Sequence, residues 1–215
     1  MALSGCFQTQ LNGPVAGAEI TLTALDNPAL VLFTGITSDR AQVIEEYGDA
    51  AWTESSTIQK LLSTGVIRLP ESDLDMNSYY LLTAHGGRNR DPGAQLRYLD
   101  QAHPVNGSWH AILPPHRIGH ENNRISLLTE ASYQWLLREN GGSLQNIMDL
   151  PAQLDRVARR AVGDLDLNGK VDYDDLLSWD IYAHKTLYRG NFQLLQHLDL
   201  ALSLNSSPDI VRKFA

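Results

Sequence analysis

A twelve-residue segment late in the chain carries oxygen-bearing side chains at spacings that suit a hard metal ion. It runs from Asp164 to Asp175 and reads DLDLNGKVDYDD. Its first, third, fifth, ninth and twelfth places hold aspartate or asparagine, and its sixth holds glycine. Ca²⁺ binds six to eight oxygens at about 2.3–2.6 Å, and this spacing turns alternate side chains toward one point. The segment therefore predicts a calcium loop.

The predicted ligands share an oxygen donor that such a loop would turn inward, and they are Asp164, Asp166, Asn168, Lys170, Asp172 and Asp175. Lys170 would use its backbone carbonyl, and Asp172 would bind directly or through water. Asp175 would close the shell at the place where an EF-hand has a bidentate glutamate. Gly169 permits the sharp turn, because glycine enters left-handed conformations without steric cost. The alternative interpretation is a solvated acidic turn before a capped helix.

Residues 164–176 resemble one dockerin-type calcium repeat, through the pattern Asp-x-Asp-x-Asn-Gly-x-Val-Asp-x-x-Asp-Leu. Dockerins carry two such repeats and bind cohesins, and this chain has one. The nearest second match begins at Asp73, but Ser78 stands where the glycine belongs. The resemblance therefore implies a single loop that serves as a structural staple.

The composition limits the classes of partner. The chain has 215 residues and a net charge of −8, which argues against nucleic acid and anionic membrane as main partners. No apolar run approaches the ~20 residues needed to span a bilayer. Cys6 is the single cysteine, so no internal disulfide is expected.

The start of the chain resembles the lipobox of bacterial lipoproteins, through Leu3-Ser4-Gly5-Cys6. The resemblance implies that residues 1–10 are a leader remnant and that Cys6 carries a lipid, the only expected link to a membrane. The implied location is outside the cell, as an outer-membrane or cell-surface lipoprotein or a secreted protein. A chance match of four residues is the alternative.

Elements that alternate in hydrophobicity dominate the front of the chain. The segment 11–22 reads LNGPVAGAEITL, which is similar to the opening of carboxypeptidase regulatory-like domains. This resemblance implies an immunoglobulin-like or prealbumin-like β-sandwich over residues 11–125. Residues 39–64 have helical spacing instead, so we expect them to form a helical insertion.

Helical periodicity takes over behind residue 125. A helix from Thr129 would end at Gly141, and Ser143 would cap a second helix through Leu150. Pro151 suits the first turn of a third helix that runs into the metal loop, with a fourth helix beyond it. A fifth helix is expected over residues 191–202. The sequence thus predicts an α+β protein with an all-helical calcium-binding domain at 126–215.

These features favour a non-catalytic, calcium-binding module of an exported bacterial cell-surface protein. Adhesion, scaffolding or ligand binding would be its role, with a protein or a polysaccharide as partner. No catalytic motif is present, and the closely spaced His110, His116 and His120 form no zinc motif. The alternative is an accessory domain of an extracellular polymer-degrading enzyme, with a carbohydrate platform formed by the aromatic residues Trp52, Trp109, Trp135, Trp179, Tyr79 and Tyr80.

Overall fold

The computed structural model describes most of the chain up to residue 178. The described ranges are 3–9, 13–39, 65–69, 74–89, 103–104, 107–120, 123–145 and 147–178. Two predicted helical segments, 40–64 within the insertion and the helix at 191–202, lie outside these ranges. Within them, no helix is both long enough and apolar enough to cross a membrane.

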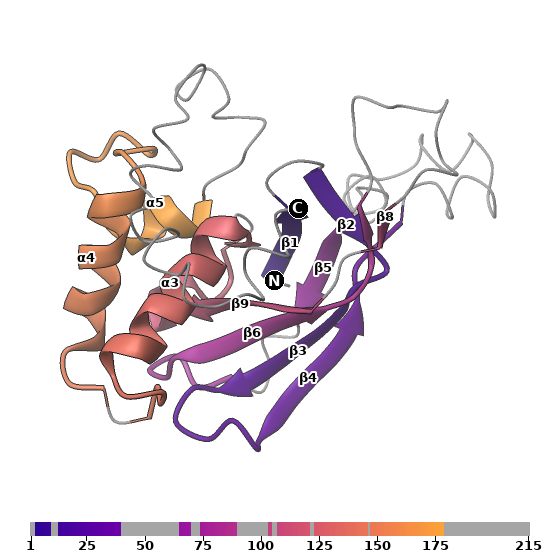
Figure 1. Ribbon diagram of the computed structural model, residues 1–215, viewed down its shortest axis with the longest axis horizontal. Coiled ribbons are helices and arrows are strands. Elements are labelled where there is room, and N and C mark those ends of the chain that lie inside the picture. Colours follow the sequence, from indigo (N-terminus) through magenta and orange to yellow (C-terminus); the bar gives the residue numbers. More distant parts are fainter. Residues whose placement is uncertain are drawn as a thin grey trace.

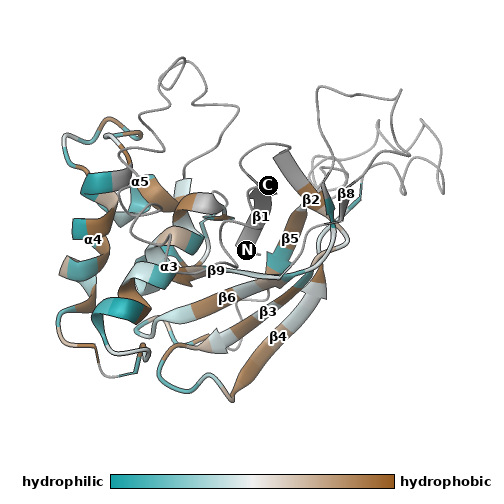
Figure 2. Ribbon diagram, viewed as in Figure 1, coloured by the Kyte–Doolittle hydropathy of each residue, from teal (hydrophilic) through white to brown (hydrophobic). Residues whose placement is uncertain are grey.

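The centre of the structure is a four-stranded antiparallel sheet in the order β4-β3-β6-β9 (Figure 1). Its strands are β3 (Glu19–Ala24), β4 (Val31–Ile36), β6 (Tyr80–His85) and β9 (Ser108–Leu113). The strands of this sheet carry brown hydrophobic bands and paler ones in Figure 2, and along β3, EITLTA, hydrophobic and polar residues alternate. Alternation places every second side chain on the same face, which is the pattern expected of half-buried strands.

A second sheet is assembled from short strands that are far apart in the sequence. Its members are β1 (Leu3–Thr9), β2 (Gly13–Ala16), β5 (Val66–Leu69), β7 (Arg88–Asn89), β8 (His103–Pro104) and β10 (Asn123–Ile125). Strand β1 pairs in parallel with β10 and antiparallel with β2 and β5. Cys6 therefore stands opposite Val66 and Arg124. The segment expected to be a leader forms a strand here, and lipidation of Cys6 stays a prediction.

In the part of the chain that the structure describes, three α-helices follow the strands. They are α3 (Leu127–Glu139), α4 (Leu150–Ala161) and α5 (Tyr173–Ser178). A capping box starts α3, in which Ser126 and Thr129 exchange side-chain and backbone hydrogen bonds. Helix α3 packs on β9, and α4 packs on α3 and α5 (Figure 1).

One predicted helix does not form. Residues 143–149 are turns and irregular backbone where they are described, and the Ser143 hydroxyl accepts a bond from the Gln145 N–H at 3.1 Å. This local bond replaces the helix cap that was predicted for Ser143. Serine side chains often bond to nearby backbone groups in turns and so compete with helix formation. The helix predicted from Pro151 is confirmed, with that proline in its first turn.

Among the described residues, one hydrophobic core includes residues from both sides of residue 125. Ile20 and Trp109 of the sheet belong to it together with Leu136 of α3, Val157 of α4 and Leu176 of α5. The α+β class is therefore confirmed. The described helices share their core with the sheet, whereas an immunoglobulin-like sandwich and a separate helical domain stay predictions.

The outer edge of β9 is closed by two side chains from the helices. The N–H of His110 donates to the Glu130 carboxylate at 2.7 Å, and the N–H of Ile112 donates to the Tyr173 hydroxyl at 3.3 Å. An edge strand otherwise presents unpaired backbone groups. Because Glu130 lies on α3 and Tyr173 starts α5, these two bonds fix both helices against the sheet.

Candidate metal centre

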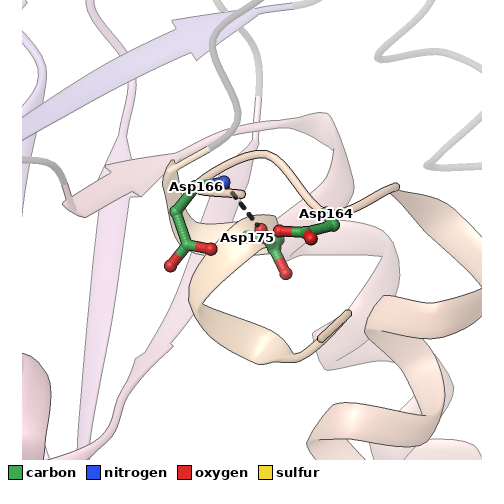
Figure 3. Close-up of side chains that lie close together, drawn as sticks. All are labelled: Asp164, Asp166 and Asp175. Carbon is green, nitrogen blue, oxygen red and sulfur yellow. Dashed lines mark hydrogen bonds between the residues drawn. The ribbon is translucent and has the colours of Figure 1, made fainter. Parts of the chain in front are cut away.

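Three aspartates converge in the segment that joins α4 to α5. Each of Asp164, Asp166 and Asp175 offers a carboxylate oxygen, and these atoms lie within 4.8 Å of one another (Figure 3). Asp166 is exposed, Asp164 is half-buried and Asp175 is only 1% exposed. A site with one open side and one buried side could admit an ion from solvent and hold it against the protein.

The first two aspartates fold the loop around themselves. The Asp164 carboxylate accepts bonds from the N–H groups of Asn168 at 3.1 Å and Gly169 at 2.9 Å. Asp166 accepts a second bond from the Asn168 N–H at 3.0 Å. Leu167 and Gly169 both have left-handed backbone, with φ of 60° and 87°. Glycine tolerates this region freely, which confirms the role predicted for Gly169.

Asp175 closes the loop from its far end. One carboxylate oxygen accepts bonds from the N–H groups of Leu165 at 2.6 Å and Asp166 at 3.3 Å, the latter drawn in Figure 3. The other oxygen accepts a bond from the Asp172 N–H at 3.0 Å. A buried carboxylate needs such partners, because burial without them is strongly unfavourable. The Asp175 carboxylate therefore connects the two ends of the loop through hydrogen bonds inside it.

The other predicted ligands border this cluster. The Asn168 side chain donates to the Asp166 carboxylate at 2.8 Å and accepts from the Lys170 N–H at 2.8 Å. Asp172 accepts a bond from the Asp174 N–H at 3.0 Å, so it caps the start of α5. The structure thus brings three of the six predicted residues together as a possible ligand group. Asn168, Lys170 and Asp172 stay predicted ligands.

The electrostatics of the loop favour a cation. Burial raises the pKa of the Asp172 carboxyl, and the nearby carboxylates of Asp174, Asp175 and Asp155 add to the rise, although a bond from the Asp174 N–H opposes it. Like charges close together disfavour ionisation, and a divalent cation among them would relieve that repulsion.

Two residues that anchor α5 were not predicted from the sequence, because they lie outside the loop motif. Asp155 of α4 accepts a bond from the Tyr173 N–H at 3.2 Å. His116 contacts the Asp174 carboxylate at 2.8 Å across a separation of 58 residues. These contacts hold α5, the helix that follows the loop, in place. No local sequence motif predicts them.

The Tyr173→Phe variant is expected to lower the free energy of unfolding by about 1–3 kcal/mol, since the buried N–H of Ile112 loses its acceptor. The ring still fills the same space, so packing is retained. Urea unfolding in EDTA measures the change. Tyr79→Phe, at a half-buried tyrosine, is the matched control, and an equal loss in both variants would refute the special role of the Tyr173 hydroxyl.

Three of the six aromatic residues predicted to form a carbohydrate platform are buried in the structure, and a fourth, Tyr79, is half-buried. Trp109 is 1% exposed and Trp135 is 5% exposed, so neither ring offers a face for stacking on a sugar. Tyr80 is also buried, while Trp52 and Trp179 lie outside the described ranges. Large aromatic rings are usually buried, because they contribute a large apolar area to the hydrophobic core.

His110 serves the fold in this structure. His110 contacts the Glu130 carboxylate at 2.8 Å and stacks on Tyr133 with ring centroids 4.0 Å apart. Among the described residues, the one group of side chains that could hold a metal is the aspartate cluster, and it includes no histidine.

Comparisons of the chain with protein-family models, with curated proteins and with solved structures each found no match. The dockerin-like segment 164–176 and the sandwich-like segment 11–22 are therefore predictions based on their own residues. The aspartate cluster is the feature of the described residues with the clearest chemistry, which is the binding of a cation by oxygen ligands.

Proposed function

We propose that the chain is a non-catalytic, calcium-binding module in which one ion in the 164–175 loop serves as a structural staple. The observation that carries this proposal is the convergence of Asp164, Asp166 and Asp175, with ligand atoms within 4.8 Å of one another. The order of the oxygen-bearing residues along the loop and the left-handed backbone at Gly169 also support the proposal.

The donor set supports calcium over other metals. Sites made of oxygen ligands alone suit Ca²⁺ and Mg²⁺, whereas zinc sites typically include cysteine or histidine. Mg²⁺ demands near-ideal octahedral geometry and keeps several waters, but Ca²⁺ accepts irregular shells of six to eight oxygens. The loop offers carboxylates, an amide and backbone carbonyls within twelve residues, which favours the larger ion.

The staple would act through neighbouring residues that face in different directions. Asp175 points into the loop, where it accepts backbone bonds, whereas Tyr173 and Asp174 contact the rest of the protein. An ion held by the loop would neutralise its carboxylates and fix the start of α5. The same helix contacts β9 through Tyr173, so the ion would stabilise the junction of helices and sheet.

We further propose that this module belongs to an exported bacterial surface protein and serves adhesion, scaffolding or ligand binding. Extracellular calcium modules function with dissociation constants of about 10⁻⁴–10⁻³ M. A closing aspartate in place of the usual glutamate suits such modest affinity, because its side chain reaches less far. The partner would be a protein or a polysaccharide, and the lipobox-like segment around Cys6 supports a surface location.

Isothermal titration with CaCl₂ tests the proposal. One Ca²⁺ per chain is expected to bind with Kd of about 10⁻⁴–10⁻³ M, and Mg²⁺ is expected to bind at least tenfold more weakly. Asp164→Asn should abolish the signal, whereas Asp26→Asn, at an exposed turn, should retain it. Absence of calcium binding by the wild-type protein, or its persistence in Asp164→Asn, would refute the proposed site.

A further inference from the structure

A buried arginine lies beside the metal loop although it precedes the loop in sequence by almost fifty residues. Arg117 ends a short 3₁₀ turn (Pro115–Arg117) and is 7% exposed. Its Nε donates to the Asn123 side chain at 2.9 Å, and another guanidinium nitrogen donates to the Ser178 hydroxyl at 3.1 Å. The guanidinium therefore bridges β10 to α5, the helix that leaves the loop.

The same guanidinium lies in the field of the loop carboxylates. One of its nitrogens is 3.9 Å from the Asp174 carboxylate. Burial lowers the pKa of Arg117, while the charges of Asp174, Asp166 and Asp172 oppose that effect. A buried charge needs opposite charge nearby, and here that charge comes from the loop.

The compensation is reciprocal. If loop carboxylates offset the burial of Arg117, then Arg117 offsets the mutual repulsion of those carboxylates. Two of the three carboxylates concerned, Asp166 and Asp172, are predicted calcium ligands. A fixed positive charge near them must also repel a calcium ion that enters the loop.

We propose that Arg117 is a built-in counter-cation of the calcium loop, which supports the loop without an ion and weakens its affinity for calcium. This inference rests on the proposed function. It makes Arg117 a residue that tunes the site from outside the loop, through charge rather than through coordination. The modest affinity proposed for the loop would then be a property of the tertiary structure as well as of the ligand set.

Calcium titrations of three Arg117 variants test the inference. Arg117→Met and Arg117→Gln remove the charge. The Asp174 carboxylate that loses its partner is half-buried and keeps its contact with His116, so neither variant leaves a fully buried charge unpaired. Both are expected to bind Ca²⁺ roughly three- to tenfold more tightly than the wild type in 10 mM salt. Arg117→Lys keeps the charge but loses the planar fork, so its Kd should stay within about twofold of the wild type.

Two further measurements separate charge from structure. Ser178→Ala removes one hydrogen bond of the guanidinium without changing any charge, and it should leave the calcium Kd unchanged. The gain in the neutral variants should shrink in about 0.5 M KCl, since salt screens charge interactions. Circular dichroism checks that each variant is folded.

The inference is overturned if a folded neutral variant binds calcium as the wild type does, or more weakly. Weaker binding in all three Arg117 variants would instead identify a role in positioning α5. The proposed function has its own distinct failure, because a wild-type protein that binds no calcium refutes the site before any variant is compared.

Discussion

Calcium is expected to raise the melting temperature of the wild-type protein, and the Asp164→Ala variant is expected to lose that rise. At the proposed Kd of about 10⁻⁴–10⁻³ M, 10 mM CaCl₂ is a roughly ten- to hundredfold excess, which adds about 1.4–2.7 kcal/mol of stability. For a chain of this size, that gain corresponds to roughly 3–10 °C. Because Asp164 is half-buried and belongs to the ligand group, its removal should abolish binding while the core stays intact.

Thermal unfolding in 10 mM CaCl₂ and in EDTA measures both effects. In EDTA, Asp164→Ala should melt close to the wild type, since it loses only the bonds from Asn168 and Gly169 in an exposed turn. Asp26→Ala, which replaces an exposed acidic residue outside the loop, should keep the full calcium response. Coincident wild-type curves in calcium and EDTA would show that the loop stabilises nothing through a metal.

A second and different loss is expected for Asp175→Ala, which should destabilise the protein even in EDTA. Its carboxylate is 1% exposed and accepts bonds from the backbone N–H groups of Leu165, Asp166 and Asp172. Removing a buried acceptor of several N–H groups lowers the free energy of unfolding by about 2–4 kcal/mol. Calcium binding should be lost as well, since the same carboxylate belongs to the ligand group.

The two aspartate variants therefore separate the roles of the cluster. Urea unfolding in EDTA should rank Asp175→Ala well below Asp164→Ala, and calcium titration should show no binding in either. Asp175→Asn is the control for shape, because it keeps one oxygen acceptor and should recover part of the stability without calcium binding. Equal stability of the two alanine variants in EDTA would contradict the internal tie assigned to Asp175.

The order of helices and strands follows largely from local sequence patterns. Alternation predicts β3, the apolar run that begins at Val31 predicts β4, and α3 ends just before Gly141 as expected. These features depend on interactions within a few residues, which a sequence displays directly. The prediction of a helix at 143–150 was wrong, and the reason is also local. The Ser143 side chain accepts a bond from the Gln145 N–H and forms a turn instead.

Pairings between distant segments were not predictable in this way. Strand β1 lies in the part of the chain expected to be a leader, yet it pairs with strands around residues 67 and 124. Its own seven residues show no strong alternation, so the partners decide its conformation. The shared core across residue 125 has the same origin, since packing between helices and sheet is not visible in periodicity.

The sequence by itself determined the chemistry of the loop from Asp164 to Asp175. Oxygen ligands at alternate places and a glycine at the turn are local requirements, and local spacing is what a sequence records. The tertiary structure decided which carboxylates converge, and it placed Arg117 beside Asp174 and the edge of β9 against Tyr173. Those contacts join residues about sixty positions apart, because the core buries α5 against the sheet and the buried polar groups there must find partners.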